Sequence, residues 1–396
     1  MTTLTTHAPE TTQTDDQRIG AAIRARREAL KMSQNQLSVA AGLPAGQSVS
    51  VIEKGDRTVK ASELVRIARA MHIEPSALLG AQTTDAPRVL WRHGSIDKNY
   101  IREAQMLERA ARYAQLERWC NDLPEAELPD YEFDPATASA NSVQHLAERT
   151  RLELQLGPVP ARTIRQRLEE DYGVKVFCEK LSHGDKEDGS AACVRHPAFG
   201  AAILMGTDEV AWRQAFSFAH ELFHLVTWTA VARAWDASTV APSQEPNWHK
   251  RLETLADTFA ATLLMPAESL TARFDAKVQD RKIALADVAG LSVEFGVSTQ
   301  ALIIRLVGLN RFPAANKQKL VGNQVLRDFS RQLRPVSQLT PSCPLPPRFE
   351  ALARTAYMRR EVGKSLLAKY LERNVADLAD FQLAPPDVSE AALTVT

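Results

Sequence analysis

Apolar residues recur at helical spacing along most of the chain, beginning near residue 17. Ile19, Ile23 and Leu30 mark one face of a first short helix, because residues three, four or seven positions apart share a face of an α-helix. Stripes of this kind continue to residue 80, separated by turns that contain glycine, and they predict five short helices. Residues 1–15 are rich in threonine and hold almost no apolar side chain, so we expect a disordered arm there.

The pattern changes in the middle of the chain. A helical run is followed by the acidic, proline-containing stretch DLPEAELPDYEFDP at residues 122–135, which predicts a linker. Three short β-prone runs then predict a small sheet: 174–178, 190–194 and 201–205. Further helices are expected at 143–156, 163–172, 208–226, 248–264, 285–309, 348–358 and 363–371.

These changes predict a mainly α fold with a small β-sheet, of the α+β class. We expect five segments along the chain. They are a disordered arm at 1–15, a five-helix domain at 16–80, a helical connector and acidic linker at 81–138, an α+β domain at 139–310, and a helical region at 311–396 for which the pattern predicts no role.

Composition excludes several classes of protein. The 396 residues suffice for two or three domains, and 44% hydrophobic with 24% charged residues is typical of folded globular chains. There is no run of about eighteen apolar residues and no basic, apolar leader, so we expect neither a membrane span nor a secretory signal. The four cysteines are scattered, without a Cys-x-x-Cys pair, which is typical of reduced thiols in a cytoplasmic protein.

The formal net charge of zero is a cancellation between segments. Residues 16–80 hold ten Lys and Arg against six Asp and Glu, a net charge of +4. Residues 121–135 hold six acidic and no basic residues, whereas residues 305–334 hold seven basic residues and one acidic residue. A local positive charge is what a DNA-binding domain needs, so the zero total does not exclude one.

The strongest chemical signal is the sequence FAHELFHLV at residues 218–226. His220 and His224 are four residues apart and therefore lie on one face of a helix, where both imidazoles can bind one metal ion. Glu221 is adjacent to the first histidine, so its carboxylate can reach a water molecule at the metal and take its proton. The alternative is an amphipathic helix with two incidental histidines.

A catalytic zinc site usually needs a third protein ligand. Glu253 lies 29 residues after His224, at the start of the predicted helix ETLADTFAATLLMP. Asp257 lies one turn later on the same face and is a candidate to orient a histidine, while His249 lies one turn earlier. From the residues alone, Glu253 and His249 both remain candidates for the third ligand.

The motifs RxxFSFAHELFHL and ExxADxFAAxLLMP closely resemble those of the ImmA/IrrE family of metallopeptidases. The resemblance extends over about residues 140–310 and implies that His220, His224 and Glu253 bind Zn²⁺, with Glu221 as the catalytic base. It thereby favours Glu253 over His249 and implies a zinc metalloendopeptidase. Members of this family cleave repressors that carry helix-turn-helix domains, which implies a regulatory protease.

A second set of motifs lies in residues 33–55, where SQxxL is followed by GL and then by SxIExG. These motifs resemble the Xre or lambda-repressor-like helix-turn-helix family, in which the third helix enters the major groove of DNA. Gln47 and Ser48 begin that helix and are candidates to read base edges. The full set of candidate DNA-binding residues is Gln34, Gln47, Ser48, Ser50, Lys54, Arg57 and Lys60.

Together the two resemblances predict a cytoplasmic transcriptional regulator with a zinc-dependent endopeptidase domain that cleaves a repressor-like protein or itself. We expect double-stranded operator DNA and a protein substrate as partners, no membrane, and a homodimer on a pseudo-palindromic operator. One alternative is a DNA-binding sensor whose zinc fold binds a ligand or partner without turnover. Another is a protease whose amino-terminal module docks on a protein, its basic surface being merely solvated.

Overall fold

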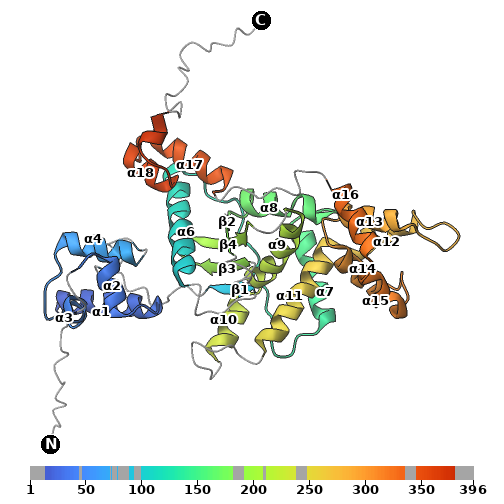
Figure 1. Ribbon diagram of the computed structural model, residues 1–396, viewed down its shortest axis with the longest axis horizontal. Helices are drawn as coiled ribbons and strands as arrows, with labels where there is room; N and C mark the ends of the chain where they lie inside the picture. Colours follow the sequence, from blue (N-terminus) through green and yellow to red (C-terminus); the bar gives the residue numbers. More distant parts are fainter. Residues whose placement is uncertain are drawn as a thin grey trace, which may run out of the picture. The chain divides into compact units, whose positions relative to one another are not determined.

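The computed structural model consists of two compact units, which are described separately (Figure 1). The smaller unit comprises Met1–Ala86 and Ile96–Arg109, and the larger comprises Pro87–Ser95 and Ala110–Thr396. The structure describes residues 14–43, 47–71, 73, 78, 89–92, 100–181, 191–207, 211–237, 248–334 and 345–379. Helices dominate and the described strands form one small sheet, so the predicted mainly α fold with a small sheet is confirmed.

Four helices of the smaller unit are fully described: α1 (Asp15–Ala29), α2 (Gln34–Ala40), α3 (Gln47–Glu53) and α4 (Ala61–Ala70). Most of the fifth helix predicted before residue 80 lies outside the described residues, as does the arm up to residue 13. The core is formed by apolar side chains with no exposed surface, among them Ile23, Leu37, Ile52 and Ile67. The apolar stripes seen in the sequence therefore face one another across this unit.

Helices α1 and α3 approach closely because α1 carries Gly20, where a Cβ atom would lie 2.3 Å from the carbonyl oxygen of Ile52. A buried ion pair joins the same helices: the Arg27 guanidinium donates to Glu53, with Nη2 3.0 Å from Oε2. Only glycine fits where α1 approaches the carbonyl of Ile52, and the buried Arg27 charge is tolerated because Glu53 pairs with it. Both features fix the angle at which α3 is held.

The larger unit is built around a four-stranded sheet of order β1-β3-β4-β2. Three strands confirm the predicted runs, namely β2 (Lys175–Glu179), β3 (Ala191–His196) and β4 (Gly200–Gly206). β3 pairs antiparallel with β4, and β2 pairs parallel with β4. The fourth strand, β1 (Leu90–Arg92), pairs antiparallel with β3 and was not predicted; it lies in the segment expected to be a connector.

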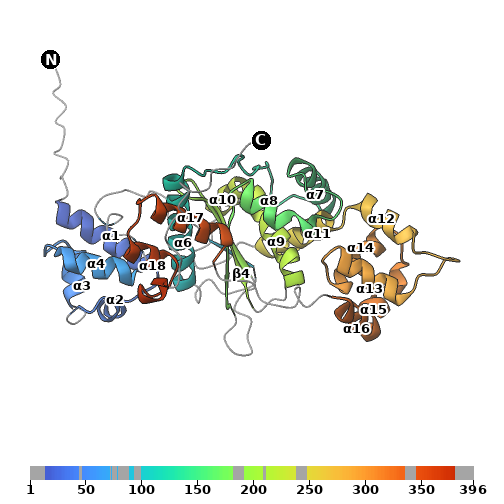
Figure 2. The ribbon, with the colours of Figure 1, turned by 90° about the horizontal axis from the view of Figure 1, so that it is seen from above.

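Helices cover both faces of this sheet (Figures 1 and 2). α9 (Ala211–Val226) packs on β3 and β4 and in turn contacts α11 (His249–Leu264), which packs on α7 (Ala140–Glu153). On the opposite face, the ring of Tyr113 from α6 (Tyr100–Cys120) meets Phe177 of β2 edge to face at 6.4 Å. The remaining helices of this unit are α8 (Ile164–Glu170), α10 (Trp228–Asp236), α12 (Ala267–Asp275), α13 (Leu285–Glu294), α14 (Thr299–Gly308), α15 (Lys317–Val321), α16 (Gln324–Leu333), α17 (Pro347–Met358) and α18 (Lys364–Tyr370).

The helix predicted at 285–309 is wrong as a single element. α13 and α14 are bent by 100° relative to each other. Gly296 between them has φ +62°, a left-handed conformation that a continuing α-helix does not allow. Ser298 then caps α14 by accepting from the backbone N–H of Ala301, so the sequence contains both a stop and a start signal.

The acidic stretch expected to be a linker lies against the larger unit instead. Leu128 and Tyr131 are buried, and the backbone N–H of Tyr131 donates to the carbonyl of Val226 at 2.6 Å. The guanidinium of Arg195 donates to the carbonyl oxygens of Leu128 and Pro129 at 3.0 and 3.2 Å. The apolar side chains between the acidic residues thus fasten this stretch to the core.

A buried ion network attaches the carboxyl-terminal helices to α6. The Glu117 carboxylate accepts from Lys175 of β2 at 3.0 Å and from Arg348 of α17 at 2.6 Å. Arg348 also donates to the Asp122 carboxylate at 3.0 Å, and Trp119 stacks on Tyr370 with ring centroids 6.2 Å apart. Residues 345–379 are therefore part of the larger unit's core packing.

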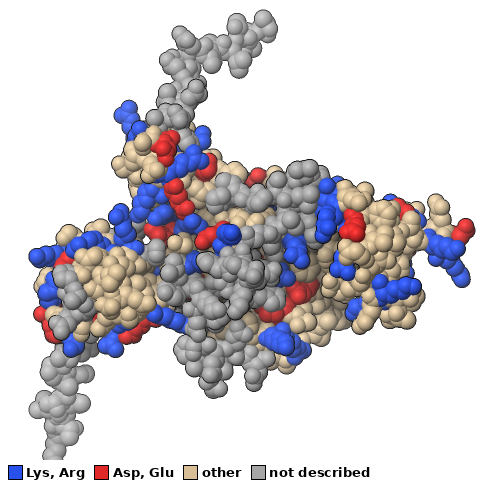
Figure 3. All heavy atoms as spheres, viewed as in Figure 1, with Lys and Arg blue, Asp and Glu red and all other residues tan. Residues whose placement is uncertain are grey.

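Two further sequence expectations concern cysteines and membranes. Cys120, Cys178 and Cys193 are free thiols and are buried, while Cys343 lies outside the described residues. Within the described part of the chain no single helix has the length and apolarity to cross a membrane, although the bent pair α13 and α14 passes that test together. On the face drawn in Figure 3, basic and acidic side chains are interspersed.

Candidate metal centre

The HExxH motif lies in the second half of α9, as its spacing predicts. His220 and Glu221 have no exposed surface, and His224 is only 2% exposed. Phe218, Ala219 and Leu222 are buried with them, because α9 is enclosed between the sheet and α11. This burial fixes the direction of both imidazoles.

Three donor atoms converge between α9 and α11. The Nε2 atoms of His220 and His224 are 3.3 Å apart, and each lies 3.2 Å from one carboxylate oxygen of Glu253. The donor atoms of these three residues all lie within 4.8 Å of one another. Four-coordinate zinc with bonds of about 2.0–2.1 Å holds its ligand atoms about 3.3 Å apart, so this donor set fits such an ion.

The rival third ligand, His249, lies farther from the centre. Its Nε2 atom is 3.8 Å from Glu253 Oε1, and its ring packs against Trp235 with centroids 5.4 Å apart. The convergent group contains Glu253 and not His249. The geometry therefore favours the ligand that the family resemblance implies.

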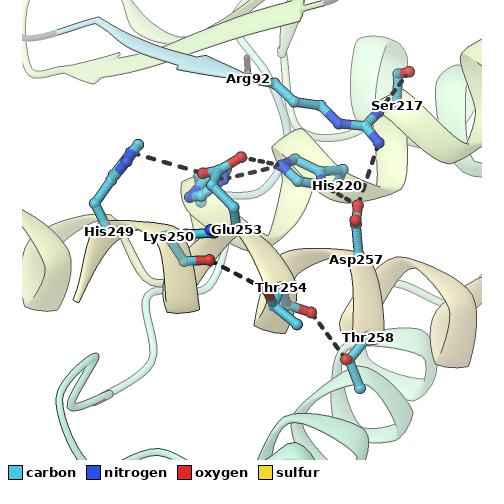
Figure 4. A network of polar contacts seen from close by, with 10 residues as sticks. Arg92, Ser217, His220, His249, Lys250, Glu253, Thr254, Asp257 and Thr258 are labelled. Carbon is cyan, nitrogen blue, oxygen red and sulfur yellow. Dashed lines mark hydrogen bonds and ion pairs between the residues drawn. The ribbon is translucent and has the colours of Figure 1, made fainter. Parts of the chain in front are cut away.

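Asp257 lies one turn beyond Glu253 and accepts from the other ring nitrogen of His220, with Oδ1 2.9 Å from Nδ1 (Figure 4). The same carboxylate accepts from Arg92 of β1 at 3.2 Å, and Arg92 also donates to the Ser217 hydroxyl at 2.9 Å. A partner on Nδ1 directs the lone pair of Nε2 toward the metal position. Asp257 thus occupies the orienting position expected of it, and Arg92 holds Asp257 in turn.

Burial and charge act in opposite directions on these groups. Burial opposes charge on His220, but hydrogen bonds to the Asp257 and Glu253 carboxylates outweigh it and raise the pKa of His220 to about 9. Burial also acts to raise the pKa of Glu253, yet its hydrogen bonds with His220 and His224 hold that pKa well below its ordinary range. The centre is therefore anionic enough to bind a cation, and binding a metal releases the proton on His220.

Glu221 lies beside this group, close enough for the charges of His220, His224 and Glu253 to act on its carboxyl group. Within the described part of the chain, no N–H or O–H group donates to its carboxylate oxygens. Burial raises its pKa, while His220 and His224 act to lower it. The thiol of Cys193 on β3 lies beside it, and burial together with the Glu221 charge raises the pKa of that thiol. A buried carboxylate with only a weakly donating thiol beside it is costly, which is typical of a group retained for its chemistry.

The candidate DNA-binding residues lie in different settings in the smaller unit. Lys54 and Lys60 are exposed, whereas Arg57 forms an ion pair with Glu63 at 2.8 Å. Ser50 on α3 is half-buried. The side chains of the two candidate base-reading residues, Gln47 and Ser48, lie outside the described residues.

Gln34 is also committed to a contact within the protein. Its side-chain amide donates to Glu53 Oε2 at 2.8 Å, next to the buried pair that Glu53 forms with Arg27. This bond braces the start of α2 against α3. Among the candidates, Lys54 and Lys60 are the ones with the most surface available for phosphates.

Sequence reasoning missed Arg92, Ser217 and Cys193 as parts of this centre. Ser217 precedes the motif by three residues, which places it on the same face of α9 as His220 and His224. Arg92 and Cys193 come from strands whose pairing is not encoded near the motif. Of these three residues, only Ser217 could have been found from helical spacing.

Comparison with known families matches one segment in each unit. Residues 23–78 match the model of the helix-turn-helix family, and residues 169–307 match the peptidase M78 model described as the IrrE N-terminal-like domain. No curated protein sequence matches the chain. The three candidate metal ligands, His220, His224 and Glu253, fall within the second matched range.

Solved structures give weaker likenesses. A Mycobacterium tuberculosis transcriptional regulator is 15% identical with a TM-score of 0.30, and the match covers 50% of this chain and 51% of that one. The chain thus spans about half the length of that protein. The apo form of the competence regulator ComR from Streptococcus vestibularis is 13% identical with a TM-score of 0.16, over 94% of this chain and 100% of that one.

Neither TM-score is high enough to identify a shared fold, so the family matches carry the assignment. Both matched ranges coincide with the motifs that suggested the resemblances from sequence. The chain joins an Xre-like helix-turn-helix domain to an IrrE-like domain of the peptidase M78 family.

Proposed function

We propose that this chain is a DNA-binding transcriptional regulator whose IrrE-like domain is a zinc-dependent endopeptidase, and that it cleaves a repressor-like protein or itself. The observation that carries the proposal is the convergence of three donor atoms from His220, His224 and Glu253 beside Glu221. The family match supports a peptidase-type domain, and the helix-turn-helix match supports DNA as a partner.

The chemistry follows from the positions of the side chains. Zinc, when bound, supplies the Lewis acidity that brings the pKa of water close to 7. Glu221 follows His220 directly in α9, and no N–H or O–H group donates to it in the described structure, so its carboxylate is available to take the proton of the attacking water. Returning that proton to the departing amine completes hydrolysis of the peptide bond. Asp257 keeps His220 in the tautomer that presents Nε2 to the ion.

The DNA-binding part of the proposal rests on the smaller unit. Its local charge is positive, and Lys54 and Lys60 are exposed on and next to the helices of the motif. We propose that it binds operator DNA as a homodimer on a pseudo-palindromic site, as helix-turn-helix proteins commonly do.

The test combines metal analysis with cleavage. We expect about one zinc ion per chain in the purified protein, lost in His224→Ala. Glu221→Gln is expected to retain the metal and lose cleavage of candidate helix-turn-helix repressors and of the chain itself. Glu268→Gln on the exposed surface of α12 is the matched control. Identical processing by the wild type and Glu221→Gln would refute the peptidase assignment.

The complete burial of Glu221 favours one second candidate. In that case the chain is a DNA-binding sensor whose metal fold binds a ligand or partner without turnover. Zinc binding with unchanged DNA binding and no cleavage of any candidate by the wild type would support this function instead.

A further inference from the structure

The short strand β1 contributes side chains to the metal centre although it lies outside the family match at 169–307. It consists of only three residues, Leu90, Trp91 and Arg92, at the edge of the sheet. Leu90 is opposite Cys193 in the register with β3, and Arg92 is opposite Ala191. Because alternate residues of a strand face the same side, Leu90 and Arg92 share the face of the sheet on which Cys193 meets Glu221.

Both side chains on this face occupy defined sites. Leu90 packs in an apolar cluster that includes Val231 of α10, with Trp228 and Trp235 against the same cluster. Leu90 itself is 7% exposed. An aliphatic side chain is therefore bound at this position by apolar surface alone.

Arg92 occupies a polar site two residues farther along the strand. Its guanidinium donates to the Asp257 carboxylate at 3.2 Å and to the Ser217 hydroxyl at 2.9 Å (Figure 4). The guanidinium also lies 5.6 Å from the ring centroid of Phe216. A carboxylate, a hydroxyl and an aromatic face together form a site selective for a guanidinium. Neutral or acidic side chains would leave Asp257 without this partner.

These contacts are those of a peptide that is recognised by strand addition. In that mode main-chain hydrogen bonds to a sheet edge supply affinity, and pockets for alternate side chains supply specificity. β1 adds to the edge of β3 and places Leu90 and Arg92 in two separate sites. The same edge carries Cys193 and therefore passes directly beside Glu221.

We propose that the β3 edge is a peptide-binding site and that β1 occupies it as an intramolecular ligand. An extended peptide with an apolar residue followed two positions later by arginine takes the place of β1 when β1 leaves. Identifying that peptide as a substrate rests on the proposed peptidase function, whereas the occupancy by β1 does not.

The burial of the catalytic base agrees with a closed state. Glu221 has no exposed surface, so a peptide carbonyl reaches it only after part of the protein moves. A three-residue edge strand has few main-chain hydrogen bonds to lose when it leaves β3. Its removal would uncover β3 along the row that leads to Glu221.

The first experiment measures binding of the fluorescent peptide PRVLWRHGS, which contains β1, to the full-length protein. Glu221→Gln is present throughout, so no cleavage occurs. In the release variant Leu90→Asp with Arg92→Glu, we expect at least about tenfold tighter binding than in the parent, because a tethered competitor acts at an effective concentration of about 1 mM. A peptide with the same two substitutions is the control and should bind neither protein. Equal binding of PRVLWRHGS to parent and release variant would overturn the proposal.

A reversible lock keeps the proposal testable if the release variant does not fold. Trp91 and Ala192 are register partners on the opposite face of the sheet, so Trp91→Cys with Ala192→Cys places two thiols within disulfide range. The reduced form should bind the peptide at least about tenfold more tightly than the oxidised form. Equal binding in the two redox states would refute occupancy of this edge by β1.

The two proposals fail separately. If the wild type cleaves no candidate but peptide binding depends on β1, the peptidase assignment falls and the binding site stands. If the wild type cleaves candidates but peptide binding is the same whatever the state of β1, the peptidase assignment stands and the proposed occupancy of the β3 edge by β1 is refuted.

Discussion

Replacing Glu117 with glutamine removes the negative charge that the buried Lys175 and the partly buried Arg348 share. Its carboxylate is 3.0 Å from the Lys175 ammonium and 2.6 Å from the Arg348 guanidinium. The side chains of Glu117 and Lys175 are each only 3% exposed, so water cannot replace the lost charge. The substitution keeps the size and shape of the side chain, which confines the change to electrostatics.

The magnitude follows from what is left behind. Removing one member of a buried ion pair costs about 3–5 kcal/mol, because the partner remains charged in a poorly solvated site. Arg348 retains Asp122 as a second acceptor at 3.0 Å, so the unpaired charge is mainly that of Lys175. We therefore expect the free energy of unfolding of the larger unit to fall by about 3 kcal/mol.

Urea unfolding followed by tryptophan fluorescence measures this loss. All six tryptophans lie in the larger unit, so fluorescence reports on that unit alone. The matched control is Glu132→Gln, whose partner Arg233 is 3.5 Å away in a pair that is 87% and 66% exposed; a loss below about 1 kcal/mol is expected there.

The pH dependence gives a second check on the same variant. Burial lowers the pKa of Lys175 and Glu117 opposes this effect, so losing the carboxylate lowers that pKa further. A folded-state lysine pKa below the unfolded value costs stability at low pH, and the cost disappears once the lysine is neutral. The loss of unfolding free energy caused by Glu117→Gln should become smaller as the pH rises from neutrality toward the ordinary lysine pKa of 10.5. A loss of unfolding free energy in Glu117→Gln that equals the loss in Glu132→Gln would refute the reasoning.

Three further perturbations test other parts of the molecule. Asp257→Asn should lower zinc affinity by about 10–100-fold, measured by competition with a chelator, because His220 loses its charged orienting partner; unchanged affinity would contradict that role. Glu53→Gln should weaken the smaller unit by about 3 kcal/mol, measured by amide hydrogen exchange in α1 and α3, since the buried Arg27 keeps only the exposed Glu28 as a counter-charge. Lys54→Ala should weaken DNA binding regardless of sequence and reduce the salt dependence of log K by about one unit, because an exposed lysine contacts phosphate; an unchanged slope would place Lys54 outside the interface.

Local patterns predicted the helical half of the metal centre. The spacing of His220 and His224 is sufficient because a helix alone places them on one face. Choosing Glu253 over His249 needed the packing of α11 on α9, which no local pattern encodes, and only the family resemblance made that choice before the structure. A sequence pattern predicts which residues share one face of a helix, but it does not predict the distances between helices.

The break at Gly296 and the strand β1 show two different reasons for missed elements. Gly296 is a recognisable helix stop signal and Ser298 a helix start signal, but the apolar periodicity on both sides suggested one continuous helix. The sequence Leu90-Trp91-Arg92 is too short to show a period of two, and it is a strand only because β3 lies beside it. Arg92 therefore reached the metal centre through tertiary structure that its neighbours in sequence do not indicate.

The contact between Glu117 and Arg348 also has a consequence for synthesis of the chain. The two residues are 231 positions apart, so a ribosome working at about 5–20 residues per second makes the arginine about 10–50 s after the glutamate. Throughout that interval α6 is complete while α17 does not yet exist, and the ring of Tyr113 lacks the contact that Phe349 later makes at 5.2 Å. The nascent chain thus presents an apolar surface next to an unfinished charge cluster, which makes it a client for chaperones until its last helices emerge.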